Sequence, residues 1–314
     1  MIQTKRWDDF PGASFLYSMQ FKLPARQPFN FHNTVRSHGW AQLAPFVYDE
    51  EQGVLHYVMR LRSGKVTEIH VREAQEGVRV ESEELTKAEQ NEVAETVTWM
   101  FGLDMDFSDF YTAAAKEPKL AHVAKKAYGR VLRSSTFFDD VVKTILTTNT
   151  LWGATKRMNA NLVAAFGDEV PGADKKAFPT PTSIAASSPE FLKEAVKVGY
   201  RASSIYELSV RVDSGELDIE SFKTSNLPTL ELRKELLKIK GVGPYAAANL
   251  LMILGRSDFI PVDSWALKLV SHEWYEGEPV MPKQVEEHFE HWGQFKGLAY
   301  WFWDWKYMQE QDEE

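Results

Sequence analysis

Hydrophobic and polar positions alternate along the first quarter of the chain. Between residues 14 and 82, short runs rich in β-branched and aromatic residues occur, such as residues 54–58 and 66–71. Gly53, Gly64 and Gly77 separate these runs. This pattern predicts antiparallel strands joined by hairpins.

From Thr86 onward the period changes, because apolar residues recur at helical spacing behind plausible capping residues. The spacing predicts helices over residues 86–101, 136–148, 154–166, 189–196, 203–214, 230–239, 244–254 and 264–274. We therefore expect an α+β fold with a small antiparallel β-rich domain over residues 1–120. A larger all-α body is expected to follow over residues 121–314 and to end in an acidic tail.

Charge is distributed unevenly along the chain. The 314 residues carry a formal net charge of −9, and most of the acidic excess lies in the C-terminal segment that ends in EQDEE. Binding depends on the local field at the contact surface more than on the total charge. The composition therefore allows a nucleic-acid partner.

The chain contains no cysteine. This excludes disulfides, a thiol nucleophile, Cys-ligated zinc and an iron–sulfur cluster. The eight histidines are scattered, and no HxH or HxxxH pair indicates a metal site. Neither a signal peptide nor an apolar run long enough to span a bilayer is visible. We expect no membrane partner, a monomer, and a cytoplasmic, nucleoid-associated location, or a nuclear one if the cell is eukaryotic.

The most informative stretch runs from Leu236 to Ala248 and reads LLKIKGVGPYAAA. An amphipathic helix can end at Gly241, and Pro244 can open the next helix. The turn between them would present backbone N–H groups of Gly243 and Tyr245, which suit a phosphate and have no base preference. An ordinary helix–turn–helix corner is the alternative.

Asp263 follows the second of these helices, within the stretch FIPVDSW. Aspartate is a favoured N-cap, so a structural role is the simpler interpretation. The functional interpretation is a carboxylate held at a fixed distance from the phosphate-binding turn, facing a nucleotide flipped out of a duplex. The hairpin and the aspartate together favour the functional interpretation.

Residues 236–270 resemble the helix-hairpin-helix/Gly-Pro-Asp DNA glycosylases, whose pattern is an LxGVG hairpin, a helix and a P-V-D sequence. Residues 178–186 are similar to bacterial 3-methyladenine DNA glycosylase II, and residues 147–149 and 199–202 to the eukaryotic 8-oxoguanine glycosylase. The resemblance covers residues 130–305. It implies a base excision repair enzyme that acts on double-stranded DNA containing damaged bases.

The resemblance also implies roles for single residues. Asp263 matches the catalytic aspartate, which stabilises the positive charge that develops on the sugar. Asn149 and Tyr200 match residues that fill the gap left by the flipped base, and Arg201 would face the estranged base or a phosphate. The expected DNA-binding residues are Gly241, Val242, Gly243, Tyr245, Asn149, Tyr200 and Arg201. A buried structural pair is the alternative for Tyr200 and Arg201.

Tyr245 departs from the pattern of the bifunctional members, in which a lysine at this position forms a Schiff base and cuts the strand. A phenol cannot form a Schiff base, so the resemblance implies a monofunctional enzyme that leaves an abasic site. Lys240, which lies where relatives have proline, is the alternative source of an amine.

The expected base pocket is aromatic and consists of Trp152, Tyr245, Trp265, Tyr300 and Trp303. Such rings attract cationic, alkylated bases by cation–π interaction, which favours alkylated purines of the 3-methyladenine type. A core role is the alternative for each ring. The alternative functions are a glycosylase for oxidised or deaminated bases and a non-catalytic, damage-sensing DNA-binding protein. In the 8-oxoguanine enzyme a glycine of the N-terminal domain senses the oxidised base, and residues 36–39 lie at a similar place.

The hairpin of relatives often holds a monovalent cation through backbone carbonyls. Here these carbonyls would belong to Leu237, Ile239 and Val242. The resemblance implies no other cofactor.

Overall fold

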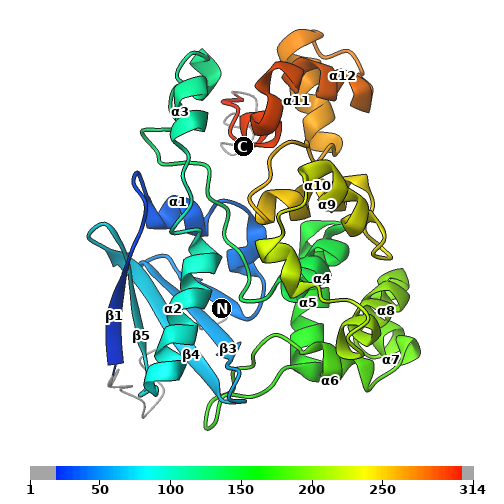
Figure 1. The fold of residues 1–314 in the computed structure, drawn as a ribbon. Helices are drawn as coiled ribbons and strands as arrows, with labels where there is room; N and C mark the ends of the chain where they lie inside the picture. Colours follow the sequence, from blue (N-terminus) through cyan, green and yellow to red (C-terminus); the bar gives the residue numbers. More distant parts are fainter. Residues whose placement is uncertain (1–18, 306–314) are drawn as a thin grey trace, which may run out of the picture.

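An antiparallel sheet forms the N-terminal part of the computed structural model, which describes residues 19–305. The strands are β1 (Met19–Pro24), β2 (Phe46–Asp49), β3 (Val54–Arg60), β4 (Val66–Ala74) and β5 (Gly77–Ser82). They are ordered β1-β5-β4-β3-β2, and every neighbouring pair is antiparallel (Figure 1). The predicted antiparallel N-terminal sheet is confirmed. The predicted acidic tail over residues 306–314 lies outside the described residues.

Helices make up most of the remaining chain. They are α1 (Phe31–Val35), α2 (Lys87–Phe101), α3 (Ser108–Ala114), α4 (Phe137–Thr147), α5 (Trp152–Phe166), α6 (Pro181–Ala185), α7 (Pro189–Glu194), α8 (Ala202–Asp213), α9 (Thr229–Leu237), α10 (Pro244–Ile253), α11 (Ser264–Trp274), α12 (Pro282–Phe289) and α13 (Lys296–Trp301). Each predicted helix is present with ends that differ by one or two residues. None of the helices between residues 19 and 305 is long and apolar enough to cross a membrane.

The ends of α2 illustrate why the sequence locates its helices well. The Thr86 hydroxyl accepts a hydrogen bond from the Glu89 N–H, and the Glu89 carboxylate accepts one from the Thr86 N–H. This capping box satisfies two N–H groups that the helix itself cannot pair. Gly102 ends the helix in the left-handed region, at φ 55°.

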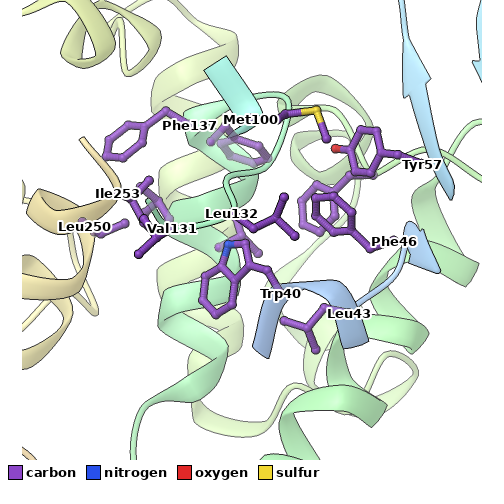
Figure 2. Close-up of a cluster of buried hydrophobic side chains, with 14 of the residues drawn as sticks. Trp40, Leu43, Phe46, Tyr57, Met100, Val131, Leu132, Phe137, Leu250 and Ile253 are labelled. Atoms are coloured by element: carbon purple, nitrogen blue, oxygen red, sulfur yellow. The ribbon is translucent and has the colours of Figure 1, made fainter. Parts of the chain in front are cut away.

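The inner face of the sheet packs against α2, and the same core continues into the helical body. Phe46 of β2 and Tyr57 of β3 share one buried cluster with Met100 of α2, Phe137 of α4 and Leu250 of α10 (Figure 2). The chain therefore does not divide into two separate cores near residue 120. As a domain boundary, residue 120 stays a prediction.

A second buried cluster joins α3 to the C-terminal helices. Phe110 of α3 lies with Val270 of α11, Phe289 of α12 and Tyr300 of α13. Helix α3, which follows α2, therefore packs with residues nearly two hundred positions later in the chain. This cluster lies on the side of the molecule that carries Asp263.

Helix α4 carries charged side chains through the first core. Lys143 and Asp139 are fully buried, and the Lys143 Nζ lies 3.1 Å from Oδ1 of Asp139. The Tyr57 hydroxyl of β3 donates to Ser135 Oγ at 2.9 Å and lies 3.4 Å from Asp139. Burial raises the pKa of Asp139 to about 7, and the Lys143 cation opposes this rise. These contacts tie the sheet to α4.

We predict that Lys143→Met lowers the free energy of unfolding more strongly as pH rises. The folded pKa of Asp139 lies above its ordinary value of 3.8, so Asp139 binds a proton on folding and its contribution to stability is lost between about pH 3.8 and 7. Without the Lys143 ammonium group the pKa of Asp139 in the folded protein rises further. The free energy of unfolding then keeps falling above pH 7, by roughly 1.4 kcal/mol per pH unit. The full deficit reaches about 3–5 kcal/mol, as for other broken buried pairs.

Urea unfolding near pH 6 and near pH 9 measures this deficit. Lys234→Met is the matched control, because Lys234 forms an exposed ion pair with Glu231 and should change stability by less than about 0.5 kcal/mol. A deficit of Lys143→Met that does not depend on pH would show that Asp139 is not coupled to Lys143.

Candidate active site

The turn between α9 and α10 adopts the hairpin geometry expected from the sequence. Gly241 has φ +88°, and a Cβ built on it would lie 2.9 Å from the side chain of Ser204 on α8, so both conformation and space require glycine. Pro244 occupies the first turn of α10 behind the N-cap Gly243. The N–H groups of Gly243 and Tyr245 make no hydrogen bond with the described residues. They can therefore bind an anion at this helix N-terminus.

Asp263 is the N-cap of α11 and uses one carboxylate oxygen for that purpose. Its Oδ1 accepts hydrogen bonds from the N–H groups of Trp265 and Ala266, each at 2.9 Å. The Tyr300 hydroxyl donates to the same oxygen at 3.4 Å. No described residue donates to Oδ2. The structural and functional interpretations of Asp263 are therefore compatible, because the cap leaves the second oxygen for chemistry.

Two phenols accompany the carboxylate and stay protonated. Burial, reinforced by the negative charge of Asp263, raises the pKa of Tyr300 well above its usual range. The same causes, in the same order, raise the pKa of Tyr245. Both side chains are therefore neutral hydrogen-bond donors at neutral pH.

A cleft of about 910 Å³ lies between the hairpin, the start of α11 and the start of α5. Eight of the residues predicted from the sequence line it: Asn149, Trp152, Tyr200, Gly241, Gly243, Tyr245, Asp263 and Trp265. Tyr300 lies behind Asp263 and not on the cleft wall. The structure thus brings together residues from four separate stretches of sequence.

The cleft has a marked electrostatic character. Within the described part of the chain, Asp263 supplies its sole carboxylate, and neither a lysine nor an arginine lines it. Burial lowers the pKa of His38 to about 4, so this imidazole is neutral at neutral pH. The cleft therefore combines one anion with neutral aromatic and polar side chains.

The N-terminal region builds one wall of the cleft, at the place where the resemblance puts residues 36–39. His38, Gly39 and Trp40 line it beside Trp152. Gly39 lies directly against the indole of Trp152, where a Cβ would overlap the ring. The Trp301 indole N–H donates to the Ser37 carbonyl at 3.0 Å and joins the C-terminal helix to the same wall.

Two exposed side chains stand at the edge of the cleft. Leu151 is 83% exposed and Tyr200 is 63% exposed, which is unusual for large apolar groups. Asn149 lines the same cleft, has φ +46° and is exposed. The sequence analysis did not predict a role for Leu151. One signal was present, because an apolar residue follows the polar run TTNT immediately before α5.

The structure places three predicted residues away from the cleft. Arg201 is buried and its guanidinium donates to the carbonyls of Ile145 and Thr148, whereas Tyr200 is exposed, so the expected roles of the two residues stay predictions. In this structure it supports the turn before Asn149. Trp303 packs against Phe289 and Trp274 in the second core. Val242 is buried beneath the hairpin.

Two further sequence predictions concern the hairpin. Lys240 forms an exposed ion pair with Glu207, at 2.9 Å, and does not line the cleft. The Ile239 carbonyl already accepts the Val242 N–H at 3.0 Å, and a carbonyl oxygen retains a second lone pair. The cation site formed by the carbonyls of Leu237, Ile239 and Val242 stays a prediction.

Comparison with known proteins gives the site a context. Residues 142–294 match the family described as HhH-GPD superfamily base excision DNA repair protein. The chain is 30% identical over 166 residues to the DNA-3-methyladenine glycosylase of Bacillus subtilis (strain 168), an alignment that covers 52% of this chain. It covers 54% of that relative, so the chain spans about half the length of the protein it matches.

Solved structures show a similar fold over most of the chain. The 3-methyladenine DNA-glycosylase from Archaeoglobus fulgidus has a TM-score of 0.73 and 22% identity, covering 90% of this chain and 97% of that one. The 8-oxoguanine glycosylase/lyase of Clostridium acetobutylicum, bound to double-stranded DNA with cytosine opposite 8-oxoguanine, has a TM-score of 0.70 and 22% identity. That alignment covers 94% of this chain and 99% of that one. At such low identity these likenesses show the fold.

We predict that Gly39→Ala destabilises the protein by about 1–3 kcal/mol, because the added methyl group must displace the Trp152 indole. Urea unfolding measures the change. Gly153→Ala is the matched control: its Cβ would meet only Arg157 at an ordinary 3.8 Å, so no loss is expected. In a Trp152→Ala background the penalty of Gly39→Ala should disappear. A penalty that persists in this background would place the clash elsewhere.

Proposed function

We propose that this chain is a monofunctional DNA glycosylase for alkylated purines of the 3-methyladenine type, and the match of residues 142–294 to the HhH-GPD superfamily of base excision DNA repair proteins supports this proposal. It would flip the damaged base out of double-stranded DNA, excise it and leave an abasic site. The observation that carries this proposal is the cleft that pairs the free oxygen of Asp263 with neutral aromatic walls.

Asp263 is the proposed catalytic residue. Breaking an N-glycosidic bond builds positive charge on the sugar, and an ionised carboxylate nearby stabilises that charge. The N-cap bonds and the Tyr300 hydroxyl hold Oδ1 and fix the orientation of the group. Oδ2 would then face the sugar. The raised pKa keeps the phenol of Tyr300 un-ionised at neutral pH, so this side chain acts as a positioning group.

The charge in the cleft favours an alkylated purine. Alkylation at ring nitrogens makes the base cationic, and a cation gains from the carboxylate and from indole faces. Trp152 and Tyr245 offer such faces, and no described lysine or arginine lines the cleft. Trp265 lines it as well, but the Lys268 ammonium already lies over that ring, 5.0 Å from its centroid. The similarity to a DNA-3-methyladenine glycosylase points in the same direction.

An 8-oxoguanine-type activity is the second candidate, and the position of Gly39 favours it. This glycine lines the cleft from the N-terminal region, the place where the resemblance would put a sensor for an oxidised base. The similarity in fold to an 8-oxoguanine glycosylase/lyase agrees with this alternative. A non-catalytic DNA-binding protein is the third candidate, although the retained Asp263 has no evident use in it.

The monofunctional assignment rests on the absence of an amine. Tyr245 stands where bifunctional relatives have lysine, and no lysine of residues 19–305 lines the cleft. Lys240 is held at the surface by Glu207. The described cleft therefore offers no amine that could form a Schiff base with the sugar.

DNA would be held at three places around the cleft. The N–H groups of Gly243 and Tyr245 would bind a phosphate without base preference. Lys156 and Arg157 are exposed on α5 and suit further phosphates. Exposed Leu151 would insert into the base stack as an apolar wedge.

Asp263→Asn is predicted to lower the rate of base release by at least about a hundredfold, because the variant lacks the charge that stabilises the sugar cation. Asparagine is as good an N-cap as aspartate, so α11 and the fold should be preserved. Single-turnover kinetics measure the rate. Affinity for damaged duplex, and its decline with salt, should match the unmodified protein. Unchanged base release would remove Asp263 from the mechanism.

The products formed from methylated duplex DNA test the substrate and the monofunctional assignment together. We expect free 3-methyladenine or 7-methylguanine by chromatography, and strand nicks only after alkali treatment. Nicks before alkali would contradict the monofunctional assignment. Release from 8-oxoguanine duplexes alone would select the second candidate, and binding without release from either substrate would select the third.

A further inference from the structure

The outer face of the sheet, opposite the face covered by α2, gathers two histidines and a glutamate. His56 on β3 pairs directly with His70 on β4 in the strand register. Glu68 lies two residues before His70, so its side chain points to the same face. Within residues 19–305 these three form the sole cluster of metal-ligating side chains of this kind.

The potential ligand atoms lie nearly as close to one another as they would in a metal site. Nδ1 of His56 lies 3.5 Å from Oε1 of Glu68, and Nε2 of His70 lies 3.7 Å from Oε2. One ligand atom from each side chain lies within 4.8 Å of the other two. In a tetrahedral zinc site with bonds of about 2.0–2.2 Å, ligand atoms stand about 3.4 Å apart. Small side-chain rotations would therefore complete the geometry.

One ligand atom has an ion-pair contact but no well-formed hydrogen bond. Nδ1 of His56 is buried and makes no hydrogen bond with the described residues. Its contact with the Glu68 carboxylate, at 3.5 Å, is longer than an ordinary hydrogen bond, so a closer ligand would improve the environment of this buried nitrogen. The nitrogen points at the glutamate that a bound cation would bridge, and a metal ion would satisfy it.

We propose that His56, Glu68 and His70 bind a divalent transition metal of the zinc class, with the fourth position open to water. Two imidazoles and one carboxylate suit such ions, whereas Mg²⁺ and Ca²⁺ prefer oxygen ligands throughout. None of the three residues lines the cleft, so this site goes beyond the proposed DNA glycosylase activity and does not depend on it.

Lys175 competes with the metal. Its Nζ lies 2.6 Å and 2.8 Å from the two carboxylate oxygens of Glu68 and supplies the positive charge there. This side chain is partly exposed, so it can turn into solvent. Metal binding therefore exchanges one cation for another. Ala177, two residues after Lys175, packs against Val58 on the same face of the sheet. The backbone is therefore held in place, and only the side chain of Lys175 has to move when a metal binds.

Titration of the purified full-length chain with Co²⁺, after removal of metals by a chelator, tests the proposal. We expect one equivalent of Co²⁺ to give the visible absorption bands of a tetrahedral complex, and Zn²⁺ to displace it. Glu68→Gln and His70→Gln should each weaken binding by at least about a hundredfold, since even second-shell changes weaken metal sites 10–100-fold. Lys175→Met should tighten binding by roughly tenfold, because both carboxylate oxygens become available.

Controls separate this site from general surface binding. His291→Gln removes an exposed histidine elsewhere, and Lys176→Met removes the neighbouring lysine, which pairs with Glu169; neither should change the affinity. Zn²⁺ should also raise the melting temperature of the unmodified chain and not that of His70→Gln. Tetrahedral bands that persist in both ligand variants, or an affinity unaffected by Lys175→Met, would overturn the proposal.

Discussion

The buried polar contacts of α4 hold the two halves of the molecule in register, and the cleft depends on them. Asp140 accepts the Trp40 indole N–H at 2.8 Å and the Ser134 N–H at 2.9 Å. The same turn of helix carries the Asp139–Lys143 pair that meets Tyr57 of the sheet. Trp40 directly follows Gly39, so these bonds determine where the N-terminal wall meets Trp152. Because α4 ends at Thr147, just before the exposed segment at 149–151, one helix positions both the wall and the edge of the cleft.

Local signals in the sequence located much of this arrangement correctly. The hairpin, the second helix and Asp263 lie within one short stretch, and each depends on conformational preferences of its own residues: a positive φ at Gly241, proline at the start of α10, and aspartate as a cap. The fold class also followed from a local signal, the change from alternating apolar residues before residue 82 to helical spacing after Thr86. Arg201 and Trp303 illustrate the limit, because a motif identifies a residue type and not the direction in which a side chain points.

The features that escaped prediction depend on contacts between distant parts of the chain. The Trp152 indole bonds to Gln42 across 110 residues, so no local pattern marks the contact between Trp152 and the N-terminal wall. The histidine cluster is a nearer example. His56 and His70 are separated by a hairpin, and only the observed register of β3 and β4 makes them direct neighbours. A register shift of one residue would turn one histidine to the opposite face, so scattered histidines in a sequence do not exclude a metal site.

Contacts between distant residues also decide the local charge, and with it how an acidic chain could hold DNA as proposed. Around the hairpin the lysines are matched by neighbouring acids: Lys238 pairs with Glu235, and Lys240 with Glu207. These pairs cancel most of the local field, so the net charge of −9 says little about the surface that a phosphate would meet. What the hairpin offers instead is a set of unpaired backbone N–H groups, which carry no formal charge and survive any substitution that preserves the turn. Anion binding through the backbone therefore depends on Gly241 and Pro244, which shape the turn, more than on basic side chains.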